Sequence, residues 1–128
     1  MNIGAASDAS AVSQRMIRHY EKIGLIPSPP RRDSGYRDYS QADVHLLRFI
    51  ANARDLGFPI EEIRVLLDLW SDRERASAEV KALAESRAVD LGRKADALNA
   101  MREALLNLAN ACHGDERPEC PILTRLAS

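Results

Sequence analysis

The chain has 128 residues, about the length of one domain, and is 45% hydrophobic but only 5% aromatic, which is typical of a helical protein. It has no run of about 18 apolar residues that could span a membrane, and its first residues do not resemble a secretion signal, so we expect a cytoplasmic protein. The formal net charge of -1 argues against a nucleic-acid partner, yet residues 10–40 hold six basic and three acidic side chains. A DNA-binding face is therefore possible if it is small or doubled by dimerisation.

The first two predicted helices are short and close together. Residues 3–9 can form one helix and residues 14–23 a second, with Asn2 and Ser13 as N-caps. The second helix places three basic side chains on one face, namely Arg15, Arg18 and Lys22. This is the helix-turn-helix layout, in which the second helix enters the major groove of DNA. A generic pair of packed helices with a solvated basic stripe would give the same pattern.

A proline-rich segment over residues 25–30 leads into a predicted hairpin. Asp33-Ser34-Gly35 is a turn signal, and the residues on either side of it can pair. The hairpin interleaves arginines with tyrosines, namely Arg31, Arg32, Tyr36, Arg37 and Tyr39. Guanidinium and phenol groups on such a loop suit the phosphates of DNA, so we interpret it as a wing.

Two further helices are predicted between residues 40 and 70. Ser40 and Asp43 have the spacing of a capping box, which starts a helix that runs to about Leu56. Pro59 then opens a helix over residues 60–70. Arg54 is a candidate phosphate contact, although it could also be a helix-end cation that faces backbone carbonyls.

Residues 71–111 contain no proline and one glycine, which predicts one long helix. Forty residues of helix would measure roughly 60 Å, more than a small domain can bury by itself. A heptad pattern places one seam position at Ser77, Ala84, Leu91, Leu98 and Leu105 and the other at Val80, Arg87, Lys94, Met101 and Leu108. The second half of this seam is apolar at nearly every position, and the first half is mixed. We interpret the segment as a two-stranded coiled coil in a homodimer, with a lone helix packed on its own domain as the alternative.

The only cysteines, Cys112 and Cys120, follow this helix in a segment of turn residues. Gly114, Pro118 and Pro121 prevent a continuing helix, so the segment must fold back and can bring the two sulfurs together. Two thiolates suit a soft monovalent ion such as Cu(I), whereas structural Zn(II) normally takes four ligands. A transient disulfide, or two unrelated thiols, would fit the same spacing.

Three stretches carry a family resemblance. They are Arg-His-Tyr-Glu-Lys-Ile-Gly-Leu-Ile (residues 18–26), Arg-Asp-Ser-Gly-Tyr-Arg-Asp-Tyr (32–39) and Leu-Gly-Phe-Pro-Ile-Glu-Glu-Ile (56–63). They resemble the signature segments of the MerR family of transcriptional regulators, in that family's order and spacing. The tail that holds Cys112 and Cys120 resembles the copper-efflux (CueR/HmrR-like) branch, which senses monovalent coinage metals.

The resemblance implies a mainly α fold with three parts. A winged helix-turn-helix DNA-binding domain would cover residues 1–70. A dimerisation helix over residues 71–111 would form an antiparallel coiled coil in a homodimer. A metal-binding loop and a short C-terminal helix would cover residues 112–128.

The resemblance also implies roles for individual residues. DNA contacts would come from the recognition helix, the wing and the next helix, namely from Arg15, Arg18, Tyr20, Arg31, Arg32, Tyr36, Arg37 and Arg54. Cys112 and Cys120 would hold one Cu(I), Ag(I) or Au(I) ion. Ser77 stands where members that sense divalent metals have a cysteine, and a hydroxyl is a poor ligand for a soft ion. His113 would lie beside the site as a loop residue that supports the ligands.

The implied function is activation of copper resistance or efflux genes. A homodimer on promoter double-stranded DNA would respond to the metal by distorting the DNA, so that RNA polymerase can read it. Two alternatives stay open, a MerR-type regulator with a thiol redox switch and a cytosolic copper-buffering protein. We do not expect an enzyme, because no cluster of nucleophile, base and orienting residue is present. Family members often have glycine where this chain has Ala11, so we expect some strain there.

Overall fold

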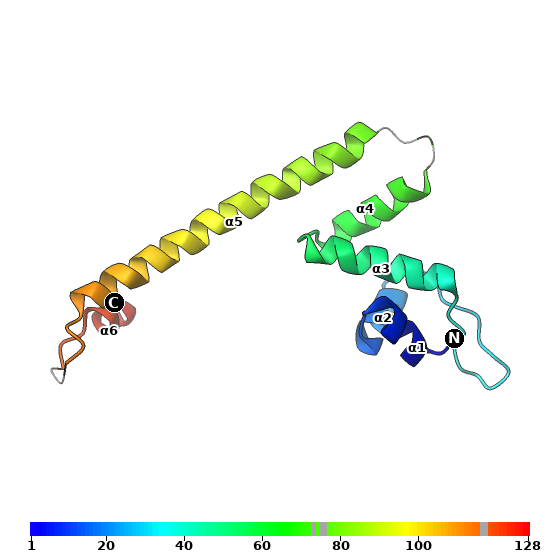
Figure 1. Cartoon of the computed structure of the whole chain (residues 1–128), viewed down its shortest axis with the longest axis horizontal. Helices are drawn as coiled ribbons and strands as arrows, with labels where there is room; N and C mark the ends of the chain where they lie inside the picture. Colours follow the sequence, from blue (N-terminus) through cyan, green and yellow to red (C-terminus); the bar gives the residue numbers. More distant parts are fainter. Residues whose placement is uncertain (73, 75–76, 116–117) are drawn as a thin grey trace. The chain divides into compact units, whose positions relative to one another are not determined.

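The computed structural model describes residues 1–72, 74, 77–115 and 118–128. These residues form six helices: α1 (Ile3–Ser10), α2 (Gln14–Lys22), α3 (Gln41–Asp55), α4 (Ile60–Ser71), α5 (Ser77–Ala111) and α6 (Pro121–Ala127) (Figure 1). The prediction of a mainly helical fold is confirmed. The chain divides into two compact units, Met1–Leu83 and Ala84–Ser128. Within the described residues, none of the helices combines the length and the apolar character needed to cross a membrane.

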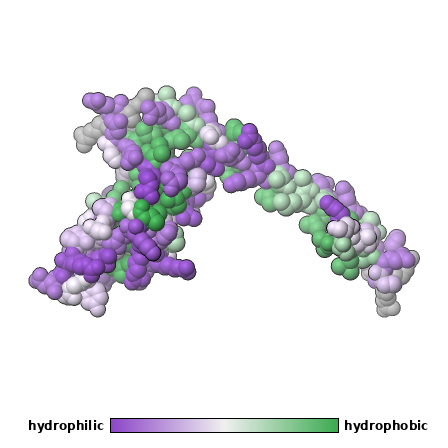
Figure 2. Space-filling view, turned by 180° about the vertical axis from the view of Figure 1, so that it is seen from behind, coloured by the Kyte–Doolittle hydropathy of each residue, from purple (hydrophilic) through white to green (hydrophobic). Residues whose placement is uncertain are grey.

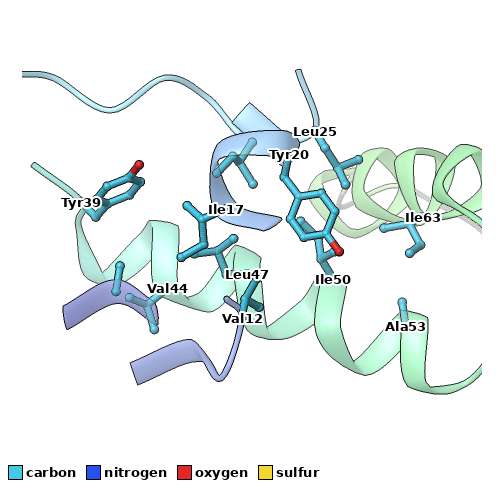
Figure 3. Close-up of a cluster of buried hydrophobic side chains, with 12 residues drawn as sticks. Val12, Ile17, Tyr20, Leu25, Tyr39, Val44, Leu47, Ile50, Ala53 and Ile63 are labelled. Carbon is cyan, nitrogen blue, oxygen red and sulfur yellow. The ribbon is translucent and has the colours of Figure 1, made fainter. Parts of the chain in front are cut away.

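The first unit has its hydrophobic core between α1, α2, α3 and α4. Helix α1 packs against α2 and α3, and α3 also packs against α4. Figure 3 shows the core side chains that converge from these helices, among them Ile17, Leu47, Ile50 and Ile63. These four side chains are fully buried, and burial of each contributes roughly 1.5–3 kcal/mol. The core therefore fixes α2 with one face inward and the other in solvent.

The predicted N-caps are confirmed. Asn2 and Ser13 each accept, through a side-chain oxygen, the backbone amide three residues later, at 2.8 and 3.2 Å. Ser40 and Asp43 form a reciprocal capping box at the start of α3. Each cap pairs an amide that the helix itself leaves open, which is typically worth about 1 kcal/mol.

The turn between α1 and α2 depends on Ala11, which adopts the left-handed conformation with φ 63° and ψ 19°. Among the residues that the structure describes, no other non-glycine residue has a positive φ. The Ala11 amide donates to the carbonyl of Ser7 at 2.9 Å and so ends α1. Because the left-handed region crowds a Cβ atom, the expected strain in this turn is confirmed.

The predicted hairpin is a short wing closed by a single antiparallel bridge between Arg31 and Arg37. The amide of Arg32 donates to the carbonyl of Tyr36 at 2.7 Å. Gly35, with φ 86°, supplies the positive φ that the tight turn requires.

The long helix begins later than predicted. Helix α4 continues through Ser71, Asp72 is extended with φ -87° and ψ 106°, and α5 starts at Ser77. The Asp72 carboxylate accepts the amide of Glu74 at 2.9 Å, a local bond that competes with helix formation. Residues 73, 75 and 76, which the prediction also placed in the helix, lie outside the described residues. Helix α5 has 35 residues, a length of about 52 Å.

Candidate functional site

The solvent-facing side of α2 carries the basic side chains that the sequence assigned to DNA. Ile17 and Tyr20 are buried on one face of this helix. Arg15, Arg18 and Lys22 are exposed on the other. The helix therefore offers a cationic surface whose backbone is held in place by the core beneath it.

Tyr20 does not face DNA, so the expectation for this residue is wrong. Its side chain is only 3% exposed and belongs to the core (Figure 3). It lies three residues after Ile17, which places both residues on the buried face of α2. The Tyr20 hydroxyl accepts a hydrogen bond from Nη1 of Arg54 at 3.3 Å. Tyr20 thus positions Arg54, which is itself exposed.

The wing presents one aromatic and several cationic side chains to solvent. Tyr36 is 74% exposed. Nη1 of Arg31 donates to the carbonyl of Gly35 at 2.9 Å, which stiffens the loop. One recess of about 140 Å³ is lined by Arg18 of α2 and by the wing residues Arg31, Tyr36 and Arg37. The structure therefore brings these four predicted DNA contacts to one surface.

Arg37 also ties the wing to α2. Its Nε donates to Oε1 of Glu21 at 2.5 Å, and the Glu21 side chain is only 7% exposed. This hydrogen bond is the main cause of the raised pKa of Arg37. One edge of the Arg37 guanidinium therefore bonds to α2 and is not available to DNA. This bond fixes the wing beside the recognition helix.

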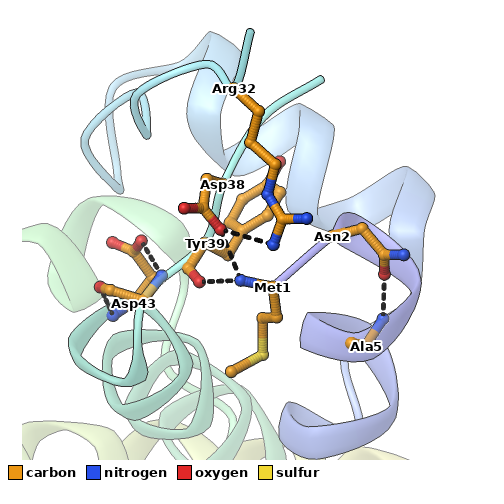
Figure 4. A network of polar contacts seen from close by, with 8 residues as sticks. Met1, Asn2, Ala5, Arg32, Asp38, Tyr39 and Asp43 are labelled. Atoms are coloured by element: carbon orange, nitrogen blue, oxygen red, sulfur yellow. Dashed lines mark hydrogen bonds and ion pairs between the residues drawn. The ribbon is translucent and has the colours of Figure 1, made fainter. Parts of the chain in front are cut away.

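A second anchor of the wing was not predicted from the sequence. The ammonium group of Met1 donates to Oδ1 of Asp38 at 2.6 Å and to the carbonyl of Tyr39 at 2.7 Å (Figure 4). Nη2 of Arg32 reaches the same Asp38 oxygen at 3.1 Å. The ammonium group and then Arg32 hold the pKa of Asp38 below its usual range. No local signal marks this contact, because its partners are 37 residues apart in the sequence.

Two other arginines link helices rather than forming part of the basic surface. Arg48 of α3 donates through Nε and Nη2 to the carbonyl of Ala9, at 3.0 and 2.7 Å. Arg64 of α4 donates to the carbonyl of Ile23 at 3.1 Å. Ala9 is near the end of α1, and Ile23 is the C-cap of α2, so these cations satisfy carbonyls that the helices leave open.

The second unit brings the two cysteines together. Sγ of Cys112 lies 3.9 Å from Sγ of Cys120, and both thiols are free and half-buried. Gly114 takes a positive φ of 65° within the loop that returns the chain, and Pro121 occupies the first turn of α6 as predicted. His113 is exposed. Around the pair, the described residues provide no cluster of three or more His, Cys, Asp or Glu side chains suited to a metal ion.

The pKa of the Cys120 thiol is lowered. The backbone amide of Leu123 is the main cause, and the amide of Ile122 and the thiol of Cys112 add to it. Cys120 is the N-cap residue of α6, but its thiol forms no capping hydrogen bond of standard geometry with the first amides of the helix. The amides therefore act mainly through their partial positive charge, which favours a thiolate.

Comparison with known proteins assigns the chain. The profile of the MerR HTH family regulatory proteins matches residues 1–70, and the profile described as MerR, DNA binding, matches residues 44–108. The chain belongs to the MerR family. It is 53% identical, over its full length and 87% of the relative, to heavy metal-dependent transcription regulator 2 of Rhizobium meliloti. It is 38% identical to the HTH-type transcriptional regulator CueR of Escherichia coli O157:H7, across 99% of this chain and 94% of that protein.

A solved MerR-family structure agrees along nearly the whole chain. The transcription regulator PbrR691 from Ralstonia metallidurans CH34, in complex with lead(II), superposes with a TM-score of 0.83 at 31% identity, covering 98% of each chain. The relatives are transcription regulators rather than enzymes. The predicted family and function class are thereby confirmed.

The long helix of this MerR-family chain exposes apolar side chains along most of its length. Figure 2 shows hydrophobic residues gathered toward the end of α5 that precedes α6. The exposed large side chains of α5 include Leu91, Leu98, Met101 and Leu105, which are four of the ten predicted heptad residues. Leu98 is 64% exposed and Leu105 is 59% exposed. Ser77, the first residue of α5, is exposed as well.

Proposed function

We propose that the protein is a metal-responsive transcriptional activator that binds promoter double-stranded DNA as a homodimer. The observation that carries the proposal is the pair of free thiols 3.9 Å apart, in a chain that also has the MerR DNA-binding fold. Residues 1–70 would bind DNA, residues 71–111 would form the dimer, and residues 112–128 would hold the metal.

DNA binding would use the exposed cations of three elements. Arg15 and Arg18 would approach the DNA from α2, Arg54 from the end of α3, and the wing would contribute Arg31, Arg32, Tyr36 and Arg37. Guanidinium groups suit phosphate oxygens in both charge and geometry. Tyr20 would act indirectly, since its hydroxyl holds Arg54.

The donor set supports a soft ion. Bonds of about 2.3 Å from one ion to two thiolates place the sulfurs about 3.8 Å apart at a tetrahedral angle and about 4.6 Å apart in line. The observed 3.9 Å between Cys112 and Cys120 is close to the tetrahedral value, so an ion held in line would require the two sulfurs to move apart by about 0.7 Å. The pair would hold one ion per protomer, and the lowered pKa of Cys120 favours the thiolate that such a bond needs.

The number of donors favours a monovalent ion. The chain has two cysteines, so no cysteine is left over as a third thiolate when each protomer binds its own ion. Ser77 stands where related divalent-metal regulators would place such a thiolate. Two thiolates suit Cu(I), Ag(I) or Au(I), whereas a divalent ion such as Zn(II) normally requires more ligands. We therefore propose copper, or another coinage metal, as the inducer, with His113 as a supporting loop residue.

The homodimer would be formed through α5. Each large aliphatic side chain taken from water contributes roughly 1.5–3 kcal/mol, and α5 exposes several of them on one heptad seam. Two antiparallel copies of this helix would bury the seams against each other. A dimer would also present two recognition helices to two half-sites, which matches a palindromic operator.

The response would pass through the short C-terminal helix. Leu123 and Leu126 of α6 are 65% and 75% exposed. These apolar side chains could therefore pack against another surface of the protein if α6 moved. We propose that closure of the cysteine loop moves α6, and that the dimer then distorts promoter DNA so that RNA polymerase can use it. The target genes would be those of copper resistance or efflux.

Serine substitution of each cysteine tests this function. Cys112→Ser and Cys120→Ser should abolish transcription that depends on Cu(I) or Ag(I), because a hydroxyl is a poor ligand for a soft ion. Affinity for promoter DNA should be almost unchanged, since the loop lies outside the DNA-binding unit. Glu119→Ser, at an exposed position of the same loop, is the matched control and should still respond. Normal activation in either cysteine variant would contradict the proposal.

A thiol redox switch is the second candidate, because two free thiols at this separation could also be oxidised together. Transcription driven by peroxide in the absence of metal would favour it. A copper-buffering protein is a weaker alternative. Such a protein would have no reason to bind duplex DNA, so an affinity that falls steeply with salt would argue against buffering.

A further inference from the structure

The hydroxyl of Tyr39 is a buried polar group that has no hydrogen-bond partner among the described residues. Tyr39 is 2% exposed and its ring belongs to the core of the first unit. In Figure 3 the hydroxyl points away from Val44 and the helix α3 beneath the ring. Buried hydroxyls in folded proteins are nearly always paired, because an unpaired one has lost its bonds to water. The missing partner is therefore expected to come from outside the chain.

Tyr39 lines the recess between the N-terminal residues, α2 and the wing. The recess has a volume of about 140 Å³, whereas a single water needs only about 10–15 Å³. Three arginines line the same recess, namely Arg18, Arg31 and Arg37. Within the part of the chain that the structure describes, Arg37 alone of the three is paired with a carboxylate, that of Glu21. The recess is thus large enough for more than one water and has a net positive lining.

The electrostatic surroundings keep the Tyr39 hydroxyl a donor. Burial is the main cause of its raised pKa, and the charge of Glu21 adds to the rise, while Arg37 and Arg18 oppose it. A raised pKa means that the phenol stays protonated at neutral pH. The hydroxyl oxygen is itself closed to solvent in the free chain, so it can donate a hydrogen bond to an acceptor in the recess once neighbouring side chains shift to admit that acceptor.

We propose that this recess receives one phosphate group of the DNA backbone, and that Tyr39 donates its hydroxyl to a phosphate oxygen. Arg18 and Arg31 supply the positive charge, and Tyr39 supplies a directed bond from a side chain that the core holds rigid. The inference rests on the proposed function, since it requires α2 and the wing to face DNA. An ordered water bonded to the hydroxyl is the competing occupant.

The first test is Tyr39→Phe in the full chain, which removes the hydroxyl and leaves the ring in the core. The probe is a duplex of about 30 base pairs, selected by the protein from a random-sequence pool and long enough for two half-sites. The affinity should fall about tenfold for each protomer, because a hydrogen bond to a charged oxygen is lost. The salt dependence should be unchanged, whereas Arg31→Gln should reduce its slope by about 0.9 for each protomer.

The melting temperature of the free protein gives an independent readout. Tyr39→Phe should leave it unchanged or raise it, since the hydroxyl has no partner in the free chain. Tyr20→Phe is the matched control, because the Tyr20 hydroxyl already accepts from Arg54, and its melting temperature should fall. A fall for Tyr39→Phe without any change in DNA affinity would overturn the proposal in favour of an internal water.

A scan of the DNA backbone identifies the phosphate. Each phosphate of the selected duplex is replaced in turn by an uncharged methylphosphonate. One position in each half-site should weaken binding by the wild-type protein more than binding by Tyr39→Phe, because the variant has already lost one of the bonds to that phosphate. If the two losses add at every position, the inference is wrong although DNA binding stands. If the wild-type protein binds no duplex, the proposed function itself is refuted together with the inference.

Discussion

Replacing Ala11 with glycine should stabilise the first unit. Ala11 holds φ 63° and ψ 19°, and this conformation costs a residue with a Cβ atom roughly 1–2 kcal/mol. Glycine adopts it without that penalty, but loses more chain entropy on folding, which offsets about 0.5–1 kcal/mol of the gain. Ala11 is exposed, so removing its methyl group sacrifices little burial. The free energy of unfolding should therefore rise by about 0.5–1 kcal/mol.

Thermal unfolding at a fixed protein concentration measures this change, because the melting temperature of a dimer depends on concentration. A gain of this size should raise the melting temperature by roughly 2–8 °C for a unit of this length. Ala5→Gly is the matched control. Ala5 is an exposed residue within α1, where glycine costs about 0.5–1 kcal/mol, so its melting temperature should fall. A similar fall for Ala11→Gly would refute the argument from backbone strain.

The remaining predictions concern pH and assembly. Because Met1 and Arg32 lower the pKa of Asp38 in the folded state, its carboxylate stabilises the wing above its unfolded pKa. This contribution is lost as the pH falls below about 4. Asp38→Asn should therefore make the melting temperature less dependent on pH in the acid range. An unchanged dependence would contradict the role given to the Asp38 carboxylate. Leu98→Asp should give a monomer in sedimentation, since a charge replaces a seam side chain worth roughly 1.5–3 kcal/mol when buried. Ala100→Asp, off the seam, should leave the dimer intact; equal dissociation of both variants would argue against the seam.

The helix starts could be predicted from the sequence because their causes are local. Asn2, Ser13 and Ser40 each cap a helix through an amide only three residues away. The pair of cysteines was predictable for the same reason. Cys112 and Cys120 are eight residues apart, and the turn residues between them favour a return of the chain.

The errors arose where a tertiary contact or a competing local bond decides the outcome. The family motif assigns Tyr20 to DNA, although its spacing from Ile17 places it on the buried face of α2. The contact of Met1 with Asp38 has no sequence signal, since it depends on the fold of the whole unit. Helix α4 ends at its C-cap Asp72, which is neither glycine nor proline, and the Asp72 side chain there accepts the amide of Glu74.

The wing illustrates why a count of basic residues overstates the positive potential at a DNA-binding surface. Arg37 is bonded to Glu21, and Arg32 is bonded to Asp38. Each pair is close to neutral, so its main effect is to fix the shape of the loop. The attractive potential then comes largely from Arg15 and Arg18 of α2, which are exposed, and from Arg31 of the wing, which donates to a backbone carbonyl and keeps its net charge. The wing would contribute mostly by directed contacts, which matter most when the DNA has to be held in a deformed state.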